Sequence, residues 1–231
     1  MPRPRVHDPD VVLDAAEALA ARSGPAAVTV RAVAALTGMS NGALYHTFGS
    51  RAGLLGRAWL RGAHRFLDLQ RELADSAGAD PGEAIVAAAE APSVFADRFP
   101  DSARLVLTVS REELLGADLP EELGDQIAAT ERQLTELLIG LAMRRWGRRD
   151  RRAVEVVTSC VVDLPTALLL RRDRWADPAA RERLRTAVRA ILALPLPAPP
   201  LTDPAEPSAA DRPRADDPSA GAHNPIRKVP Q

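Results

Sequence analysis

Apolar residues recur at intervals of three and four along most of this chain, which is the spacing of a helix that buries one face. Over residues 9–22, for example, Val12, Ala16 and Leu19 fall on one side. No segment alternates apolar and polar residues as a half-buried strand does, and aromatic residues, which favour strands, make up only 3%. The pattern therefore predicts an all-α protein, in which 46% apolar residues among 231 are enough to bury a core.

Pairs of aspartate and proline mark three helix starts, at residues 8–9, 80–81 and 177–178. The aspartate can accept a hydrogen bond from the first turn, and proline fits the first helical position because its missing amide hydrogen would have no partner there. Glu83 follows Asp80 by three residues, which is the spacing of a capping box. Thr29 and Ser50 are further capping candidates. These signals predict helices at about 9–22, 30–36, 40–47, 51–73, 81–98, 101–115, 120–146, 150–172 and 178–193.

The net charge of −1 hides an asymmetry along the chain. Residues 1–65 contain eight arginines and four acidic residues, a net charge of +4, whereas the remainder has a net charge of −5. A basic segment joined to an acidic one favours an anionic partner for the basic segment. A chance imbalance of surface charge is the alternative.

Several classes of protein are disfavoured by what the sequence lacks. The one cysteine, Cys160, allows no disulfide framework and suits a reducing compartment. No run of about 18 apolar residues predicts a membrane span, and the N-terminus has no apolar signal-peptide core. Phosphate-binding glycine loops, nucleophile elbows and metal-ligand spacings are missing as well. We therefore expect a cytoplasmic protein that is not an enzyme and has no cofactor, no metal and no membrane partner.

Residues 30–48, VRAVAALTGMSNGALYHTF, contain two short helical patterns joined by a turn. Ala34 is small, as required where two helices cross closely. Gly38 follows four residues later, where the turn needs a left-handed backbone. Leu44 then anchors the second helix in the core. A small residue, a glycine and an inward aliphatic residue at this spacing predict a helix-turn-helix.

The outward face of the second helix of this motif is small and polar. It comprises Ser40, Asn41, Gly42, Ala43, Tyr45 and His46. Gly42 costs about 1 kcal/mol in a helix relative to alanine, so its bare backbone should have a use, such as close approach to DNA. Tyr45 can donate its hydroxyl to a phosphate. His46 has no second metal-ligand residue nearby, so a groove contact or simple solvation explains it better than a metal site.

Residues 8–66 resemble the N-terminal domain of the TetR family of transcriptional regulators. The resemblance is carried by the first amphipathic helix, Thr29-Val30-Arg31, Ala34, Gly38, Phe48 and the stretch SNGALYHTFGSRAGLL. Two positions depart from the family pattern. Arg51 stands where lysine is more usual, and Gly53 stands where an acidic residue is common, which should soften the start of the following helix.

The resemblance implies a homodimer in which each subunit presents one helix-turn-helix to a half-site of a palindromic operator in double-stranded DNA. It implies phosphate contacts for Thr29, Tyr45 and Arg51. Arg31, Asn41, Gly42 and His46 would lie nearest the bases, with Ser40 on the same face. Arg3 and Arg5 either reach a minor groove or belong to a frayed terminus.

The resemblance also implies that residues 75–194 bind a small molecule and form the dimer. Two apolar stripes could build a four-helix interface, or they could face the core of their own chain. They comprise Val154, Val157, Val161, Leu164 and Leu168, and Leu184, Val188, Ile191 and Leu192. Within the apolar run of the first stripe, Pro165 predicts a kink because it cannot donate to residue 161.

The candidate walls of a ligand pocket are residues of the expected body helices: Phe95, Leu107, Met143, Trp146, Cys160, Asp163 and Thr166. Asp163 could face a cationic ligand, but pairing with an arginine or exposure to solvent is commoner for such a residue. Cys160 is best explained as a small buried apolar residue. The arginines of residues 143–152 should be solvated or paired with acids, for which Glu112, Glu113, Glu121 and Glu122 are candidates.

We therefore expect five parts: a flexible basic arm (1–7), a helix-turn-helix domain (8–50), a connecting helix (51–74), a ligand-binding and dimerisation domain (75–194) and a disordered tail (195–231) with ten of the twenty prolines. The favoured function is a repressor that a small molecule releases from its operator. An architectural or interaction factor that binds DNA without an inducer is the alternative.

Overall fold

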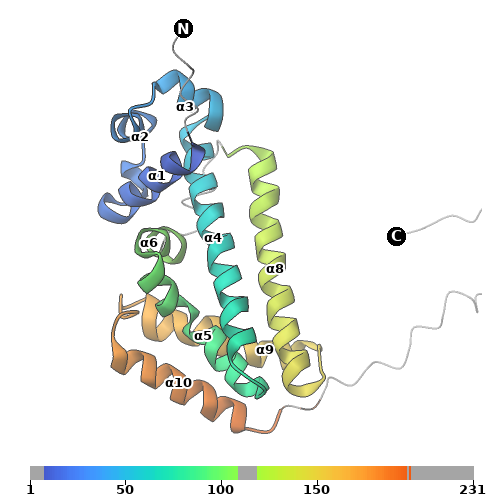
Figure 1. The fold of residues 1–231 in the computed structure, drawn as a ribbon. Helices are drawn as coiled ribbons and strands as arrows, with labels where there is room; N and C mark the ends of the chain where they lie inside the picture. Colours follow the sequence, from blue (N-terminus) through green and yellow to red (C-terminus); the bar gives the residue numbers. More distant parts are fainter. Residues whose placement is uncertain (1–7, 109–118, 197, 199–231) are drawn as a thin grey trace, which may run out of the picture. The chain divides into compact units, whose positions relative to one another are not determined.

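The computed structural model describes residues 8–108, 119–196 and 198, and within them the chain is helical and has no strand (Figure 1). The N-terminal elements are α1 (Pro9–Ser23), the 3₁₀ turn η1 (Pro25–Ala27), α2 (Val30–Thr37) and α3 (Asn41–Phe48). The long helix α4 (Arg51–Ser76) follows. The remaining helices are α5 (Pro81–Arg98), α6 (Pro100–Thr108), α8 (Glu121–Trp146), α9 (Arg151–Thr158), the π-helical segments η2 (Ser159–Asp163) and η3 (Thr166–Leu170), and α10 (Pro178–Ala193). The expected all-α fold is confirmed.

The predicted caps form in the structure. Asp8, Asp80 and Asp177 each accept a hydrogen bond from the amide two residues ahead, at 2.8–3.0 Å. The predicted capping box, however, is wrong for Glu83, which should bond back to the amide of Asp80. The carboxylate of Glu83 accepts two hydrogen bonds of 2.8 Å from Arg189 of α10, so it joins two helices instead of closing its own first turn.

The predicted helix at residues 150–172 follows a less regular path than its apolar pattern suggests. Arg151–Leu170 is continuous, but η2 and η3 on either side of Pro165 are π-helical. The amide of Arg171 donates to the carbonyl of Thr166, five residues back, at 3.0 Å. Widened turns of this kind compensate for the hydrogen bond that the nitrogen of Pro165 cannot donate, so the helix continues through Pro165. Of the helix expected at residues 101–115, the part from residue 109 on lies outside the described residues, as do the basic arm and nearly all of the tail.

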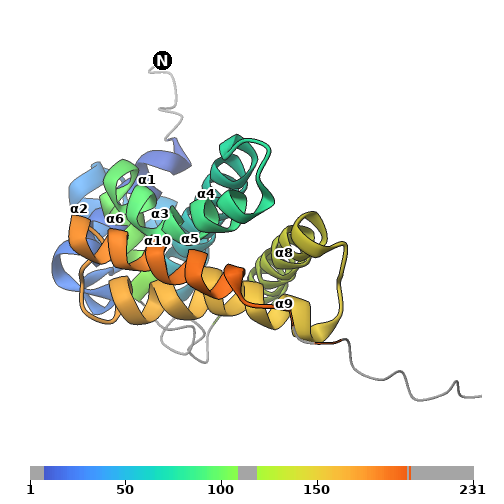
Figure 2. The ribbon, with the colours of Figure 1, turned by 90° about the horizontal axis from the view of Figure 1, so that it is seen from below.

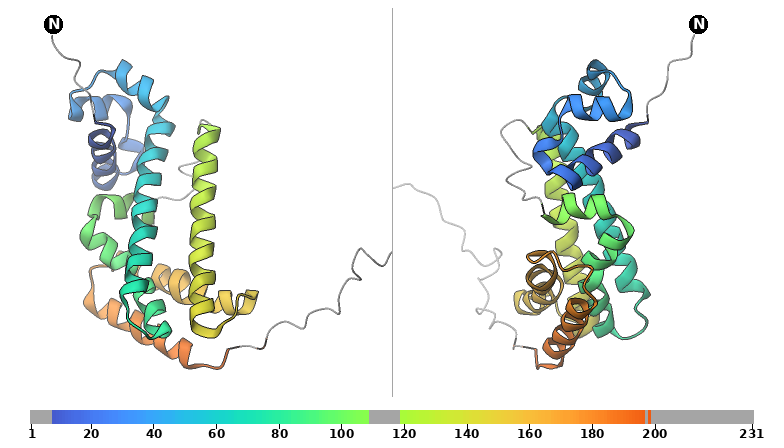
Figure 3. Two further views of the ribbon diagram at one scale, coloured as in Figure 1. Left: turned by 45° about the vertical axis from the view of Figure 1, so that its right-hand side comes forward. Right: turned by 90° about the vertical axis from the view of Figure 1, so that its left-hand side faces the viewer.

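Helix α4 joins two sets of helices (Figures 1 and 3). At its N-terminal end it packs against α1 and α3, and their shared core includes Val12, Leu44, Phe48 and Leu54. Leu105 of α6 also enters that core. The second core lies in the body, where α5 packs against α4, α10 and η2. The helix-turn-helix is therefore attached to the body by both α4 and α6.

The two apolar stripes mostly face the core of their own chain. Val157, Val161, Leu184, Val188 and Leu192 are all buried there, because α10 lies along the helix of α9, η2 and η3 (Figure 2). The interpretation of the full stripes as a dimer interface is therefore wrong for these residues. Their neighbours Val154, Leu164, Leu168 and Ile191 are only half-buried and pack at the edge of the core.

Three of the arginines of residues 143–152 pair with acids, and none of these three pairs involves Glu121 or Glu122. Arg144 contacts Asp75 at 2.8 Å, and Arg151 contacts Glu155 at 2.8 Å. Arg148 and Asp150 form a two-pronged pair at 2.6 and 2.9 Å. Hydrogen bonding to Arg148 lowers the pKa of Asp150 to about 2. Residues 112 and 113 lie outside the described residues, so pairing with Glu112 or Glu113 stays a prediction.

One stretch, Arg151–Leu170, is long and apolar enough to cross a bilayer by length and composition, although the sequence was expected to contain none. Core helices of globular proteins share this composition. Val157, Cys160 and Leu169 of this stretch are fully buried in the body core, which accounts for its apolar character.

Candidate DNA-binding site

The turn between α2 and α3 has the geometry that its sequence predicts. Gly38 has a left-handed backbone, with φ 70° and ψ 12°, and its amide donates to the carbonyl of Ala34 at 2.9 Å. Thr29 accepts a hydrogen bond from the amide of Ala32 at 3.1 Å, and Ser40 accepts one from Ala43 at 3.2 Å. Thr29 caps α2 as expected, and Ser40, which was not among the capping candidates, caps α3.

Helix α3 is anchored to the core by one narrow face. Leu44 and Phe48 are 1% and 5% exposed, respectively. Beyond Phe48 the chain turns at Gly49, and Ser50 caps α4 by accepting a hydrogen bond from Gly53 at 2.9 Å. A Cβ atom at Gly53 would overlap the carbonyl oxygen of Phe48. Gly53 therefore does more than soften the helix start, because only glycine lets α3 and α4 approach this closely.

The opposite face of α3 is open to solvent. Ser40, Asn41, Gly42, Tyr45 and His46 are all exposed, and Tyr45 retains 55% of its accessible surface. A Cβ atom at Gly42 would meet only the hydroxyl of Ser40, at 4.0 Å. Packing within the described chain therefore does not require glycine at this position, in contrast to Gly53.

The cations near this face differ in their availability. Arg31 of α2 is exposed and makes no ion pair within the described part of the chain. Arg51 donates from Nε to the carbonyl of Val28 at 2.7 Å and from Nη2 to that of Pro25 at 2.6 Å. Its guanidinium therefore holds the loop before α2 against the start of α4. The remaining N–H groups of the exposed Arg51 side chain and the amides at the N-terminus of α4 are the groups of this segment suited to a phosphate.

An ionic cluster, which we call the junction cluster, links α1, α4 and α6; its Glu17 is buried and its two aspartates are exposed. Arg61 of α4 contacts Asp10, Asp14 and Glu17 of α1 at 3.1, 2.6 and 2.8 Å. The second oxygen of Glu17 accepts a hydrogen bond of 2.5 Å from Ser102 of α6. Burial alone would lower the pKa of the Arg61 guanidinium, but its bonds to Glu17 and the two aspartates raise the pKa above its ordinary value. The cluster fixes the orientation of the helix-turn-helix on the body.

Sequence analysis missed the junction cluster, although a signal was present. The acids of α1 recur at intervals of four and three residues, and Arg61 is followed four residues later by Arg65. Each set therefore lies on one helix face. Which two faces meet depends on the crossing of α1 and α4, and no local pattern encodes that crossing.

The seven candidate ligand residues do not gather around one cavity. Phe95 is fully buried beside Phe66, with ring centroids 5.3 Å apart. Cys160 is fully buried in the body core, where burial raises the pKa of its thiol to about 11. Met143 is 44% exposed and Asp163 is exposed. Leu107, Trp146 and Thr166 are half-buried on three different elements.

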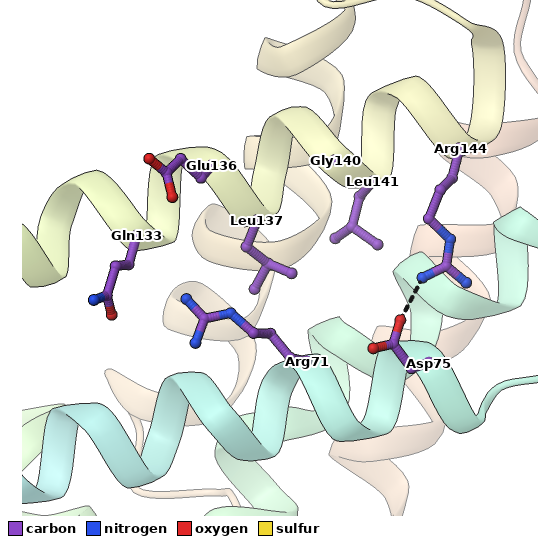
Figure 4. A pocket seen from close by; sticks show the side chains of 8 residues that line it. All are labelled: Arg71, Asp75, Gln133, Glu136, Leu137, Gly140, Leu141 and Arg144. Carbon is purple, nitrogen blue, oxygen red and sulfur yellow. Dashed lines mark hydrogen bonds and ion pairs between the residues drawn. The ribbon is translucent and has the colours of Figure 1, made fainter.

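A cavity of about 280 Å³ lies instead between α4 and α8, and none of the seven residues lines it (Figure 4). Its walls include Arg71 and Asp75 of α4 and Glu136, Gly140 and Arg144 of α8. Within residues 8–108, 119–196 and 198, no group of three or more His, Cys, Asp or Glu side chains is arranged to hold a metal ion.

Comparison with known proteins agrees with this geometry. Residues 12–58 match the family model described as bacterial regulatory proteins, tetR family. No curated protein matches the chain. Among solved structures, a TetR-like transcriptional regulator from Rhodococcus sp. RHA1 is 20% identical with a TM-score of 0.61, over 83% of this chain and 99% of that one.

Two further solved structures have the same fold. The TetR family transcriptional regulator PfmR from Thermus thermophilus is 23% identical with a TM-score of 0.57, over 78% of this chain and 96% of that one. A protein from Saccharomonospora viridis, described as a transcriptional regulator in complex with choline, is 19% identical with a TM-score of 0.58, over 80% and 94%. Residues 12–58 thus form an N-terminal domain of the tetR family of bacterial regulatory proteins, and the chain has the fold of these regulators.

Proposed function

We propose that the chain represses transcription by binding a palindromic operator as a homodimer, and that a small molecule releases it. The observation that carries the proposal is the exposed face of α3. Its side chains are small or polar, and Gly42 leaves the backbone bare although no contact within the described chain requires this. Polar groups on an exposed helix of this motif suit base edges and phosphates in a major groove.

In this proposal the residues have different roles. Asn41, Gly42 and His46 lie nearest the bases, together with Arg31. Ser40, Thr29 and Tyr45 contact phosphates, although the hydroxyls of Ser40 and Thr29 also cap their helices. Arg51 contacts a phosphate with the N–H groups that are not bound to the carbonyls of Pro25 and Val28, together with the amides at the N-terminus of α4.

Dimerisation is supported by the half-buried apolar side chains of α9 and α10. Val156 of α9 and Ile191 of α10 line an open cavity of about 440 Å³ together with Ser159, Arg152 and Glu155. A second copy of the chain would cover these side chains. Ile191→Glu should therefore yield monomers by light scattering, whereas Thr186→Glu, elsewhere on the same helix and away from this cavity, should leave dimers.

The proposal is tested by selecting bound duplexes from a randomised DNA library at near-physiological salt. Enrichment of a palindrome is expected, because two identical reading heads related by symmetry bind two identical half-sites. Salt-sensitive binding without any enriched sequence would contradict the proposal and favour an architectural DNA-binding factor.

Three variants sharpen the selection. Tyr45→Ala should abolish the enrichment, and Gly42→Leu should do so without unfolding the protein, because the added side chain has free space in the isolated chain. Gly124→Leu is the matched control. It adds the same side chain to α8 at a position where a Cβ atom also meets nothing within 4 Å, and it should select the same palindrome as the parent chain.

A further inference from the structure

The contact between α4 and α8 is close near the N-terminal ends of both helices and leaves a cavity farther along them. At the tight end, a Cβ atom at Gly56 would lie 2.5 Å from a methyl group of Leu123. Toward the other end of both helices lies the 280 Å³ cavity introduced above, which we call the α4–α8 groove. Pockets for small molecules commonly span about 300–1,000 Å³, so the groove lies just below the lower end of that range and has room only for a ligand of few atoms.

The floor of the α4–α8 groove is apolar and partly bare. Leu137 and Leu141 of α8 lie on either side of Gly140 in the groove (Figure 4). Glycine in the middle of a 26-residue helix reduces helix stability relative to alanine. A Cβ atom at Gly140 would meet nothing within 4 Å, so packing in the described chain does not account for this glycine. Its effect is to leave the floor of the groove open.

Opposite charges face each other across the groove without touching. The guanidinium of Arg71 on α4 points toward Gln133 and Glu136 on α8 (Figure 4). The described structure has no hydrogen bond or ion pair between Arg71 and Glu136; Arg71 instead contacts Asp68 of its own helix at 3.1 Å, where both side chains are exposed. The far end is closed by Asp75 and Arg144, which neutralise each other at 2.8 Å. The groove therefore offers one cation and one anion to a ligand.

We propose that the α4–α8 groove binds a small zwitterion with a branched aliphatic side chain, of the class of the free α-amino acids. The ligand carboxylate pairs with Arg71 and its ammonium group with Glu136. The aliphatic side chain covers Leu137 and Leu141 above the bare backbone of Gly140. This inference rests on the proposed function, because it supplies the effector of the proposed regulator.

Binding in the groove would reach the DNA-binding face through α4. That helix begins in direct contact with α3, where Gly53 lies against the carbonyl of Phe48. A ligand that widens the groove turns α4 relative to α8 about the close contact of Gly56 with Leu123, against the Arg144–Asp75 ion pair that closes the far end. Because the same helix carries both contacts, ligand and DNA affinities are coupled, and each reduces the other by the same factor.

The test uses the full chain with leucine, isoleucine and valine as probes, measured by titration calorimetry up to about 10 mM, which is roughly the weakest affinity that an effector could use. At least one probe should bind saturably. Two analogues of each probe serve as controls. One keeps the carboxylate and lacks the amino group, and the other keeps the amino group and lacks the carboxylate. Each should bind at least about tenfold more weakly than its parent, since each loses one ionic contact. Failure of all three probes to bind, or equal binding of the analogues, would overturn the proposal.

Substitutions locate the site. Arg71→Gln and Glu136→Gln should each weaken binding of the effective probe at least about tenfold. Gly140→Leu should abolish it by filling the groove, whereas Gly124→Leu on the same helix should bind the probe as the parent chain does. Unchanged binding by Gly140→Leu, with a parental thermal unfolding curve, would place the ligand elsewhere and refute the assignment.

The DNA selection separates this inference from the proposed function. An enriched palindrome that is unaffected by any probe leaves the operator-binding proposal intact and refutes only the effector assignment. If a probe binds saturably but the chain enriches no DNA sequence, the ligand assignment stands and the operator-binding proposal is refuted. If both are correct, saturating probe should weaken operator binding at least about fivefold, the lower range of allosteric coupling.

Discussion

Two surfaces of this molecule use their polar side chains in different ways. On the body, arginines of α10 pair with acids of α5: Arg181 with Asp97 at 2.8 Å, Arg185 with Glu90 at 2.6 Å and Arg189 with Glu83 at 2.8 Å. On the exposed face of α3, the described chain contains no ion pair, and the polar groups lie open.

The difference separates charges that hold the fold together from groups kept available for a partner. Pairs across α5 and α10 satisfy each other and set the register of two helices. The polar groups of α3 contribute nothing comparable within the chain, because that helix is held by Leu44, Phe48 and its caps. The junction cluster is a third case, in which charges around the buried Glu17 fix the DNA-binding domain on the body.

The largest effect is expected from breaking the junction cluster. Glu17→Gln removes a buried charge that contacts Arg61 and Ser102, and it should lower the free energy of unfolding by about 3 kcal/mol. Urea denaturation measures this change. An effect below about 1 kcal/mol would show that the cluster stabilises no more than the exposed pairs of the body.

The two glycines of the DNA-binding domain should respond in opposite ways. Gly53→Ala forces a Cβ atom against the carbonyl of Phe48 and should cost about 1–3 kcal/mol of stability. Gly42→Ala meets open space, so it should leave the free energy of unfolding unchanged or slightly raised while it weakens DNA binding. Thermal unfolding together with fluorescence anisotropy on operator DNA distinguishes the two. Equal stability losses would remove the distinction between them.

A smaller effect is expected from the surface pairs of the body. Hydrogen bonding to Arg189 lowers the pKa of Glu83 below its ordinary value. The stabilisation from this pair is therefore complete above the unfolded-state pKa of about 4.3 and is lost as the pH falls through the lower folded-state value. Glu83→Gln should cost less than about 1 kcal/mol at pH 7 and nothing at about pH 2. A larger loss under acid than at neutral pH would contradict this assignment.

The smallest effect is expected at Cys160. Burial raises the pKa of its thiol to about 11, so almost no thiolate forms at about pH 8. Iodoacetamide should leave the native protein unmodified by mass spectrometry and should alkylate it completely in guanidinium chloride. Rapid alkylation of the native chain would show that the body opens locally around the π-helical segments.

Short-range signals predicted much of the fold. The helices expected at residues 81–98 and 178–193 have those bounds in the structure, because each begins with an Asp-Pro cap. The left-handed turn at Gly38 and the caps at Thr29, Ser40 and Ser50 follow from the same local chemistry. The recognition helix could be predicted because its motif occupies one continuous stretch of sequence.

Tertiary structure alone decided which surfaces meet. The bonds of Arg51 to the loop before α2, the pairing of Glu83 with Arg189 and the cluster of acids around Arg61 all depend on residues distant in sequence. Gly42 and Gly53 are a further example. A Cβ atom would face solvent at Gly42 and a carbonyl at Gly53, and the sequence alone does not distinguish the two positions.

Sequence by itself therefore determined where the helices begin and end and which segment is the DNA-binding motif, because caps, turns and helical periodicity act over a few neighbouring residues. Tertiary structure decided the pairing of charges, the tight and open ends of the α4–α8 contact and the partial burial of α9 and α10. Those features depend on how helices cross, and many side chains distant in sequence set each crossing together.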